Sequence, residues 1–320
     1  MATIVGCVNL SHSPYWNLVP EPRGDEQGAH FVEAVNAVRE LVLGLRPDAI
    51  VVFGPDHARG LFYDVMPPFT IGIEQVRGIG DYETPSGALK TTPALARAVF
   101  DGVTRRGFDP ALSLDLSIDH GLAQVYGKLI PSLDVPIIPI IVNACCSPLP
   151  TYARSWAFGR AVGEALRNAP GDDRVIIIGS GGISHWPNSI DAFDENITPE
   201  WRDFLIHGRP EVAQREAARQ AKLRHLAENP ETGYVNAEWD QSFLGRLLAD
   251  VSVLANLEDG EVEALAGPGA GELRAWAAAT AAWGGSMRWT DYEAVGNWIT
   301  GMGVAASHVP VSRQVHPQRD

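Results

Sequence analysis

The chain has few cysteines and no long apolar run. Its three cysteines are Cys7, which lies in a predicted strand, and the neighbours Cys145 and Cys146, which are poorly placed to bridge each other. Because neither a disulfide framework nor a Cys-x-x-Cys metal motif is present, we expect a protein of the reducing cytoplasm. No stretch of about 18 uninterrupted apolar residues occurs, so we expect no membrane-spanning helix.

Positively charged residues are also scarce in the chain. The chain has 25 Lys and Arg residues against 39 Asp and Glu, which gives a net charge of −14 and a pI of about 5.0. This balance argues against nucleic acid or an anionic membrane as a partner. With 45% hydrophobic and 20% charged residues, the 320-residue chain has an ordinary globular composition and enough apolar material for a large core.

Predicted strands and helices alternate along the chain up to residue 179. The strands are short runs rich in Val, Ile and Leu, and the helices carry apolar residues at helical spacing. We expect strands at 2–10, 49–53, 112–117, 135–143 and 174–179, and helices at 26–45, 92–106 and 150–167. This alternation predicts an α/β fold.

A lone histidine follows four of the predicted strands, just past the point where each strand ends. The clearest case is the strand 174–179, which runs through a glycine-rich turn to His185. A single histidine in such a loop is usually only a hydrogen-bonded loop residue. Four at equivalent positions predict one shared site, because ligands bind at the carboxyl edge of an α/β sheet. The four are His12, His57, His120 and His185. We expect them to bind a metal, to act as acid and base, or to do both.

Four acidic residues are candidates to complete a metal site, since two histidines and one carboxylate suit Fe(II) oxygenases. Asp56 and Asp119 each directly precede a histidine and would point the opposite way in an extended chain, so we interpret them as structural. Glu238 and Asp240 lie in the first turn of a predicted helix, 236–250, where helix capping is an equally good interpretation. The glycine-rich turn at 179–182 is neither G-x-G-x-x-G nor a Walker sequence, so a nucleotide site is disfavoured.

Together, four short segments resemble the signature segments of the class III extradiol ring-cleavage dioxygenases, the LigB superfamily. They are Ser11-His12-Ser13-Pro14, Pro55-Asp56-His57, Asp119-His120-Gly121 and Gly181-Gly182-Ile183-Ser184-His185. Their order and spacing agree with that family over about residues 3–305. The segment 62–69 and the Ala- and Trp-rich C-terminal region are most similar to the 2,3-dihydroxyphenylpropionate (3-carboxyethylcatechol) 1,2-dioxygenase branch.

The resemblance implies an iron enzyme that opens catechols beside, not between, the two hydroxyls. Its cofactor would be Fe(2+), held by His12, His57 and Glu238, with Asp240 as the other choice for the third ligand. His120 and His185 would form the acid–base pair, in which His185 removes a proton from the catechol and His120 donates one. The partners would be a small aromatic diol and O₂. The alternatives are a zinc hydrolase on the same ligands and a non-catalytic binding protein of this fold.

Substrate binding is expected to involve side chains near the second and fourth histidines. The set is Arg59, Phe62, Tyr63, Met66 and Trp186. The apolar members would pack on a catechol side chain. The guanidinium of Arg59 would meet a carboxylate, unless Arg59 is simply a solvated loop residue.

The resemblance also implies the organisation of the chain. We expect a central mixed sheet flanked by helices, with a helical C-terminal extension. Residues 1–312 would form a single catalytic domain, with an α/β core (1–200), a mostly helical part that completes the site (201–312) and a polar tail (313–320). Tryptophans near the C-terminus suggest a homo-oligomer. Residues 77–91 are polar and contain glycine, a composition suited to a mobile flap.

Overall fold

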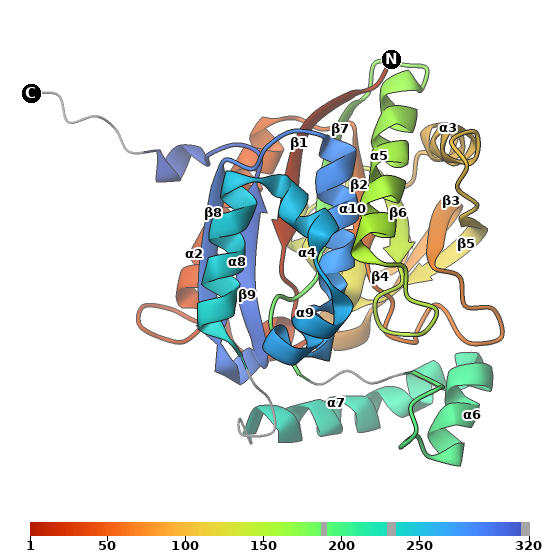
Figure 1. The fold of residues 1–320 in the computed structure, drawn as a ribbon, viewed down its shortest axis with the longest axis vertical. Helices are drawn as coiled ribbons and strands as arrows, with labels where there is room; N and C mark the ends of the chain where they lie inside the picture. The colour runs from red at the N-terminus through yellow and green to blue at the C-terminus, as the bar shows by residue number, and fades with distance from the viewer. Residues whose placement is uncertain (187–190, 229–234, 315–320) are drawn as a thin grey trace, which may run out of the picture.

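The chain folds around one nine-stranded sheet (Figure 1). The structure is a computed structural model and describes residues 1–186, 191–228 and 235–314. The strand order is β4-β3-β6-β2-β7-β1-β9-β8, and β5 pairs with β3 outside this path. The strands are β1 Thr3–Leu10, β2 Ala49–Gly54, β3 Phe69–Ile79, β4 Ser86–Leu89, β5 Ala111–Ile118, β6 Ile137–Val142, β7 Arg174–Ser180, β8 Trp289–Val295 and β9 Thr300–Ala306.

The centre of the sheet is parallel, antiparallel pairs join it to both flanks, and β5 adds a further parallel pair with β3. Strand β7 pairs in parallel with β1 and β2, and β2 pairs in parallel with β6. On either side, β3 runs antiparallel to β6 and β9 runs antiparallel to β1. Every residue of β2 and β6 is buried, as expected for strands covered on both faces. The predicted α/β fold with a central mixed sheet is therefore confirmed.

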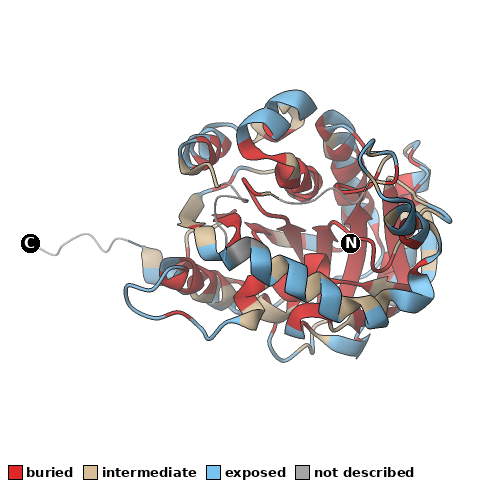
Figure 2. Cartoon of the chain, turned by 90° about the horizontal axis from the view of Figure 1, so that it is seen from below, coloured by how far each residue is buried: buried red, intermediate tan, exposed pale blue. Residues whose placement is uncertain are grey.

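Helices cover both faces of the sheet and bury two apolar layers (Figure 2). One face packs against α3, α5 and α10, and the other packs against α2 and α4. The helices are α1 Tyr15–Leu18, α2 Ala29–Gly44, α3 Pro93–Thr104, α4 His120–Leu129, α5 Tyr152–Asn168, α6 Pro199–His207, α7 Val212–Glu228, α8 Ala237–Ala249, α9 Asp259–Ala266 and α10 Leu273–Trp283. Figure 1 shows α6 and α7 lying together below one end of the sheet. No helix in the described ranges is long and apolar enough to cross a membrane.

The C-terminal region is less helical than its composition suggests. The expected helix is present as α10, but β8 and β9 follow it and complete one flank of the sheet. Strand β9 has the sequence TGMGVAA, and its Gly and Ala residues are poor strand formers. It becomes a strand because β1 and β8 pair with it on both sides, a long-range effect that local composition does not report. The division into residues 1–200 and 201–312 stays a prediction.

The segment 77–91 forms an ordered hairpin. It spans the end of β3, a 3-10 turn at Asp81–Glu83 and β4. Asp81 and Tyr82 are buried in this turn although the backbone of Tyr82 has a φ of +50°. The expectation of a mobile flap is therefore wrong, because these two side chains anchor the turn inside the protein.

Helices α5 and α10 approach closely because glycines in α5 face alanines in α10. A Cβ on Gly159 would lie 2.0 Å from the carbonyl oxygen of Ala278. Gly163 faces Ala282 in the same way, at 2.2 Å. The close approach therefore requires glycine at both positions, because the backbone of α10 cannot move aside for a methyl group as a flexible side chain could.

We predict opposite effects for two helical glycine substitutions. Gly159→Ala should lower the free energy of unfolding by about 1–3 kcal/mol, because the new methyl group separates α5 from α10. Gly245→Ala, at an exposed position of α8 with open space around it, should raise it by up to about 1 kcal/mol. Urea unfolding followed by circular dichroism measures both. Equal effects of the two changes would contradict the close-packing argument.

Candidate active site

Four imidazoles meet beyond the carboxyl ends of the strands. His12 follows β1, His57 follows β2, and His185 follows β7, while His120 is the first residue of α4, just after β5. The ring centroids of His12 and His57 are 5.3 Å apart, those of His12 and His120 are 5.4 Å apart, and those of His57 and His120 are 4.2 Å apart. His185 joins them through a shared carboxylate neighbour. The structure thus brings all four histidines of the sequence pattern into one place.

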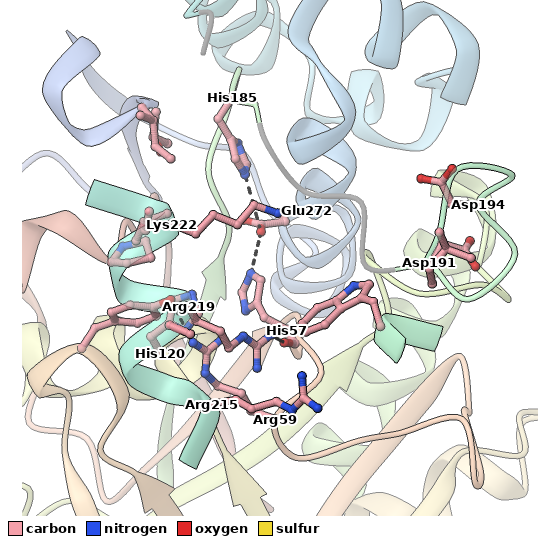
Figure 3. Close-up of a pocket in the computed structure, with 18 of the residues that line it drawn as sticks. His57, Arg59, His120, His185, Asp191, Asp194, Arg215, Arg219, Lys222 and Glu272 are labelled. Carbon is pink, nitrogen blue, oxygen red and sulfur yellow. Dashed lines mark hydrogen bonds and ion pairs between the residues drawn. The ribbon is translucent and has the colours of Figure 1, made fainter. Parts of the chain in front are cut away.

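The carboxylate at the centre of the four histidines belongs to Glu272. This residue ends a 3-10 turn, Pro268–Glu272, immediately before α10. Its Oε1 lies 3.0 Å from His57 Nε2 and 3.7 Å from His185 Nε2, and its Oε2 lies 3.7 Å from His12 Nε2. Figure 3 shows Glu272 between His57 and His185. The backbone N–H of Gly182 donates to Oε2 at 2.8 Å, which ties Glu272 to the turn before His185.

Glu238 and Asp240 do not lie at the histidine cluster. Glu238 is exposed in the first turn of α8. Asp240 is buried, but it accepts hydrogen bonds from Ser184 and from Tyr292 Oη, and it lines no part of the histidine pocket. The prediction of Glu238 as the carboxylate beside the histidines is therefore corrected to Glu272. The one sequence signal for Glu272 is an acidic residue just before the apolar helix 273–283.

Each imidazole is held by its Nδ1 atom, which leaves Nε2 for the centre of the site. Nδ1 lies 3.0 Å from Asp119 Oδ2 in His57, 2.6 Å from Asp81 Oδ2 in His120, 3.1 Å from the Ile183 carbonyl in His185 and 3.1 Å from Ser180 Oγ in His12. Carboxylate and carbonyl acceptors require Nδ1 to be the protonated nitrogen. This pattern is typical of histidines in metal sites, where a partner on one nitrogen orients the other toward the metal.

The two aspartates that precede histidines are structural, as their sequence positions indicate. Asp119 caps α4 by accepting from the N–H of Gly121, and its other oxygen accepts from His57. Asp56 accepts from the backbone N–H groups of Gly60 and Leu61 and so closes the loop after His57. These bonds fix the backbone on which His57 and His120 stand.

Burial and mutual contact set the charges of the cluster. Burial lowers the pKa of His12 to about 3, and neighbouring imidazoles add to this effect. Burial also opposes a proton on His57, but Asp119 and Glu272 outweigh it and raise the pKa of His57 to about 10. Burial favours the neutral form of Glu272, yet the surrounding histidines hold its pKa well below the usual value. Without a metal, the cluster therefore carries an ionised Glu272 beside a protonated His57.

The donor atoms around Glu272 suit a metal ion. Metal–ligand bonds of about 2 Å place neighbouring donors about 3 Å apart, close to the 3.0 Å between His57 Nε2 and Glu272 Oε1. A thiol, Cys145, also lies within reach of His57 and Glu272. Burial raises the pKa of Cys145 well above its usual value, so the thiol is protonated when no metal is bound. The remaining set of imidazoles and a carboxylate fits a divalent metal such as Fe(II).

A pocket of about 600 Å³ opens from the histidine cluster toward α6 and α7. The predicted residue Arg59 lines it, but the Arg59 guanidinium is buried and pairs with Asp81 and Glu216. It is therefore not a solvated loop residue, and its charge is already compensated within the protein.

The four apolar or aromatic residues of the predicted substrate set do not line this pocket. Phe62 is fully buried against Phe204, and Tyr63 donates to Asp191. Met66 packs beside Cys145 and Cys146, and Trp186 lies against Gly267. The pocket wall comes instead from α6 and α7, which the sequence did not single out. They contribute Trp201, Arg215, Ala218, Arg219, Lys222 and Leu223.

Comparison with known proteins agrees with this site. Residues 6–305 match the family model described as the catalytic LigB subunit of aromatic ring-opening dioxygenase. A 2,3-dihydroxyphenylpropionate/2,3-dihydroxicinnamic acid 1,2-dioxygenase of Azotobacter vinelandii is 37% identical over 316 residues, covering 93% of this chain and 97% of the relative. A second dioxygenase of this name, from Dechloromonas aromatica, is 34% identical over 320 residues, covering 96% and 98%.

A solved structure shares the fold. It is an uncharacterized protein from Escherichia coli K12, with a TM-score of 0.52 and 16% identity, and the match covers 94% of this chain and 98% of that one. The family match and the full-length relatives displace the zinc hydrolase and the non-catalytic binding protein as alternatives. The chain belongs to the LigB family of class III enzymes and is an extradiol ring-opening dioxygenase.

Proposed function

We propose that the protein uses Fe(II) to open the ring of a catechol that carries a short carboxyalkyl chain next to its hydroxyls, as 2,3-dihydroxyphenylpropionate does. The observation that carries the proposal is the convergence of three Nδ1-anchored histidines on one buried carboxylate, with the fourth, His120, stacked on His57. The choice of substrate is supported by the names of the full-length relatives. The pocket of about 600 Å³ has room for a substituted catechol.

We assign His12, His57 and Glu272 as the metal ligands. His12 and His57 present Nε2 to the two oxygens of Glu272, and one face of the group opens into the pocket. Iron bound there would mediate the transfer of electrons from the catechol ring to O₂. Asp119 and Ser180 hold the outer nitrogens of the two histidines, and Gly182 holds the carboxylate. The ligands are therefore in position before the metal arrives, which lowers the cost of binding it.

We assign His185 as the base. Its Nδ1–H donates to the carbonyl of Ile183, so the lone pair lies on Nε2, which faces Glu272 and the pocket. This nitrogen is positioned to take the proton from a catechol hydroxyl placed over the ligands.

We assign His120 as the acid. Its Nδ1 lies 2.6 Å from the carboxylate of Asp81, which orients the ring, and burial together with His57 lowers the pKa of His120 well below its usual value, so that a second proton is readily given up. Arg59, at 3.0 Å from the same carboxylate, holds Asp81 in place. The buried hairpin turn at 81–83 thus serves the site by orienting His120, so that Nε2 can deliver a proton to a developing anion.

The substrate assignment predicts the outcome of a direct assay. Protein loaded with Fe(II) under anaerobic conditions should consume O₂ and form a yellow ring-opened product with 2,3-dihydroxyphenylpropionate. Its kcat/KM for this acid should exceed that for unsubstituted catechol and for protocatechuate, whose carboxylate is attached directly to the ring. Oxygen uptake with each diol measures this order. A preference for protocatechuate, or no uptake with any diol, would contradict the proposal.

The ligand assignment predicts different effects for two glutamates. Glu272→Gln keeps the shape of the side chain but removes its charge, so the protein should lose most of its bound iron. Glu238→Gln, an exposed change on α8, should keep it. Iron per chain after Fe(II) loading and desalting is the measurement, and circular dichroism confirms folding. Iron loss in Glu238→Gln with iron retention in Glu272→Gln would show that Glu238, and not Glu272, is the metal ligand.

The acid–base assignment predicts that replacing either histidine lowers catalytic turnover without changing iron binding. His185→Ala and His120→Ala should each bind iron as the unmodified protein does, and each should lower kcat by about 10²–10⁴, the usual contribution of a positioned proton donor or acceptor. Iron content and steady-state O₂ uptake with 2,3-dihydroxyphenylpropionate give the two quantities. Loss of iron in either variant would place that histidine among the ligands instead.

A further inference from the structure

Helix α7 turns a basic face toward the histidine pocket. The residues that line the pocket from this helix are Arg215, Ala218, Arg219, Lys222 and Leu223. Their spacing of three and four residues places them on one side of the helix. In a chain with a net charge of −14, three positive side chains on one short stretch of pocket wall stand out. The protein partners of each side chain determine which of the three is available to a ligand.

The two arginines on this face already have protein partners. The guanidinium of Arg219 donates to the backbone carbonyls of His57 and Ala58, so it braces the loop that carries a proposed metal ligand. The guanidinium of Arg215 donates to Glu211 and Glu200. Arg59, which contacts α7 through Glu216, is likewise paired with two carboxylates. Carboxylates therefore compensate the charges of Arg215 and Arg59 before any ligand enters, and two backbone carbonyls hold the Arg219 guanidinium against the loop after β2.

Lys222 differs from the arginines of the pocket. Within residues 1–186, 191–228 and 235–314, no hydrogen bond or ion pair is formed by its ammonium group. Lys222 is exposed, and Figure 3 shows its side chain reaching from α7 toward Glu272. The acidic residues Asp191 and Asp194 lie on the other side of the pocket in this view. An anionic group on a ligand would be attracted to α7 and repelled from the opposite wall.

We propose that Lys222 is the residue that selects the carboxylate of the substrate side chain. The inference rests on the proposed function, because it places the catechol ring at His12, His57 and Glu272. With the ring there, a side chain next to the hydroxyls has to extend into the pocket, where Lys222 is a cation whose ammonium group has no partner among the described residues. A charged hydrogen bond of this kind is worth about 1.5 kcal/mol or more, which corresponds to about a tenfold effect on substrate binding.

The test compares two substrates of similar length, 2,3-dihydroxyphenylpropionate and the uncharged 3-propylcatechol. The iron-loaded full chain should prefer the acid, as the ratio of the two kcat/KM values. Lys222→Met should lower this ratio about tenfold, mainly through KM for the acid. Lys222→Arg should restore part of it, because the charge remains. Lys90→Met is the matched control, since Lys90 is exposed, binds the Asp134 carbonyl and does not line the pocket.

Three outcomes would overturn the assignment. The ratio could be unchanged in Lys222→Met, both substrates could weaken equally, or Arg215→Met could abolish the preference for the acid while Lys222→Met keeps it. Failure of the proposed function itself would give a different experimental result. An unmodified protein that turns over neither catechol refutes the ring-opening substrate itself, whereas one that turns over both without a preference refutes only the role of Lys222.

Discussion

The structure depends on one buried carboxylate. Glu272 is enclosed in protein, and an unpaired charge in such a place would cost several kcal/mol. Its charge is matched by the protonated His57 and by the N–H of Gly182, while His12 and His185 each place Nε2 3.7 Å from one of its oxygens. These partners come from three strands of the sheet, while Glu272 comes from the start of α10. The same charge that requires the histidines therefore joins the C-terminal helix to the carboxyl edge of the sheet.

The histidines in turn are fixed from outside. Asp119, Asp81, Ser180 and the Ile183 carbonyl each hold one Nδ1 atom, and each of these partners lies on or beside a regular element. Rotation of an imidazole would leave a buried donor without a partner, which costs more than the bond itself contributes. The cluster is thus rigid before any ligand is present. Rigid donors around a concave opening are what metal binding and directed proton transfer both require.

The pocket combines this rigid floor with a separate cover. The floor is the carboxyl edge of the sheet, where open α/β folds bind ligands. The cover is made by α6 and α7, which lie below that edge in Figure 1 and supply Trp201, Arg219 and Lys222 to the lining. A division of this kind separates the chemistry from the recognition of the substrate. In our proposals the ring-opening chemistry uses the histidines, and α7 selects the side chain of the substrate.

The α/β character of the fold and the four candidate histidines of the site could be predicted from the sequence alone. Runs such as Val175–Ile178 are local signals for buried strands, and parallel strands end at one edge, so the residues just beyond β1, β2 and β7 have to meet. His120 follows β5, which pairs with β3 outside this parallel centre, so its place beside His57 depends on the tertiary fold. The carboxylate that lies beside the histidines and the residues that form the pocket wall could be identified only from the tertiary structure. Glu272 stands 215 positions from its partner His57 with no motif around it, while Glu238 has the same chemistry near an N-cap and faces solvent. Phe62 and Met66 look like pocket residues by composition, but they fill the interior. Burial and distance between remote segments are properties of the folded chain, because they arise only when β9, α7 and α10 pack against strands formed far earlier in the sequence.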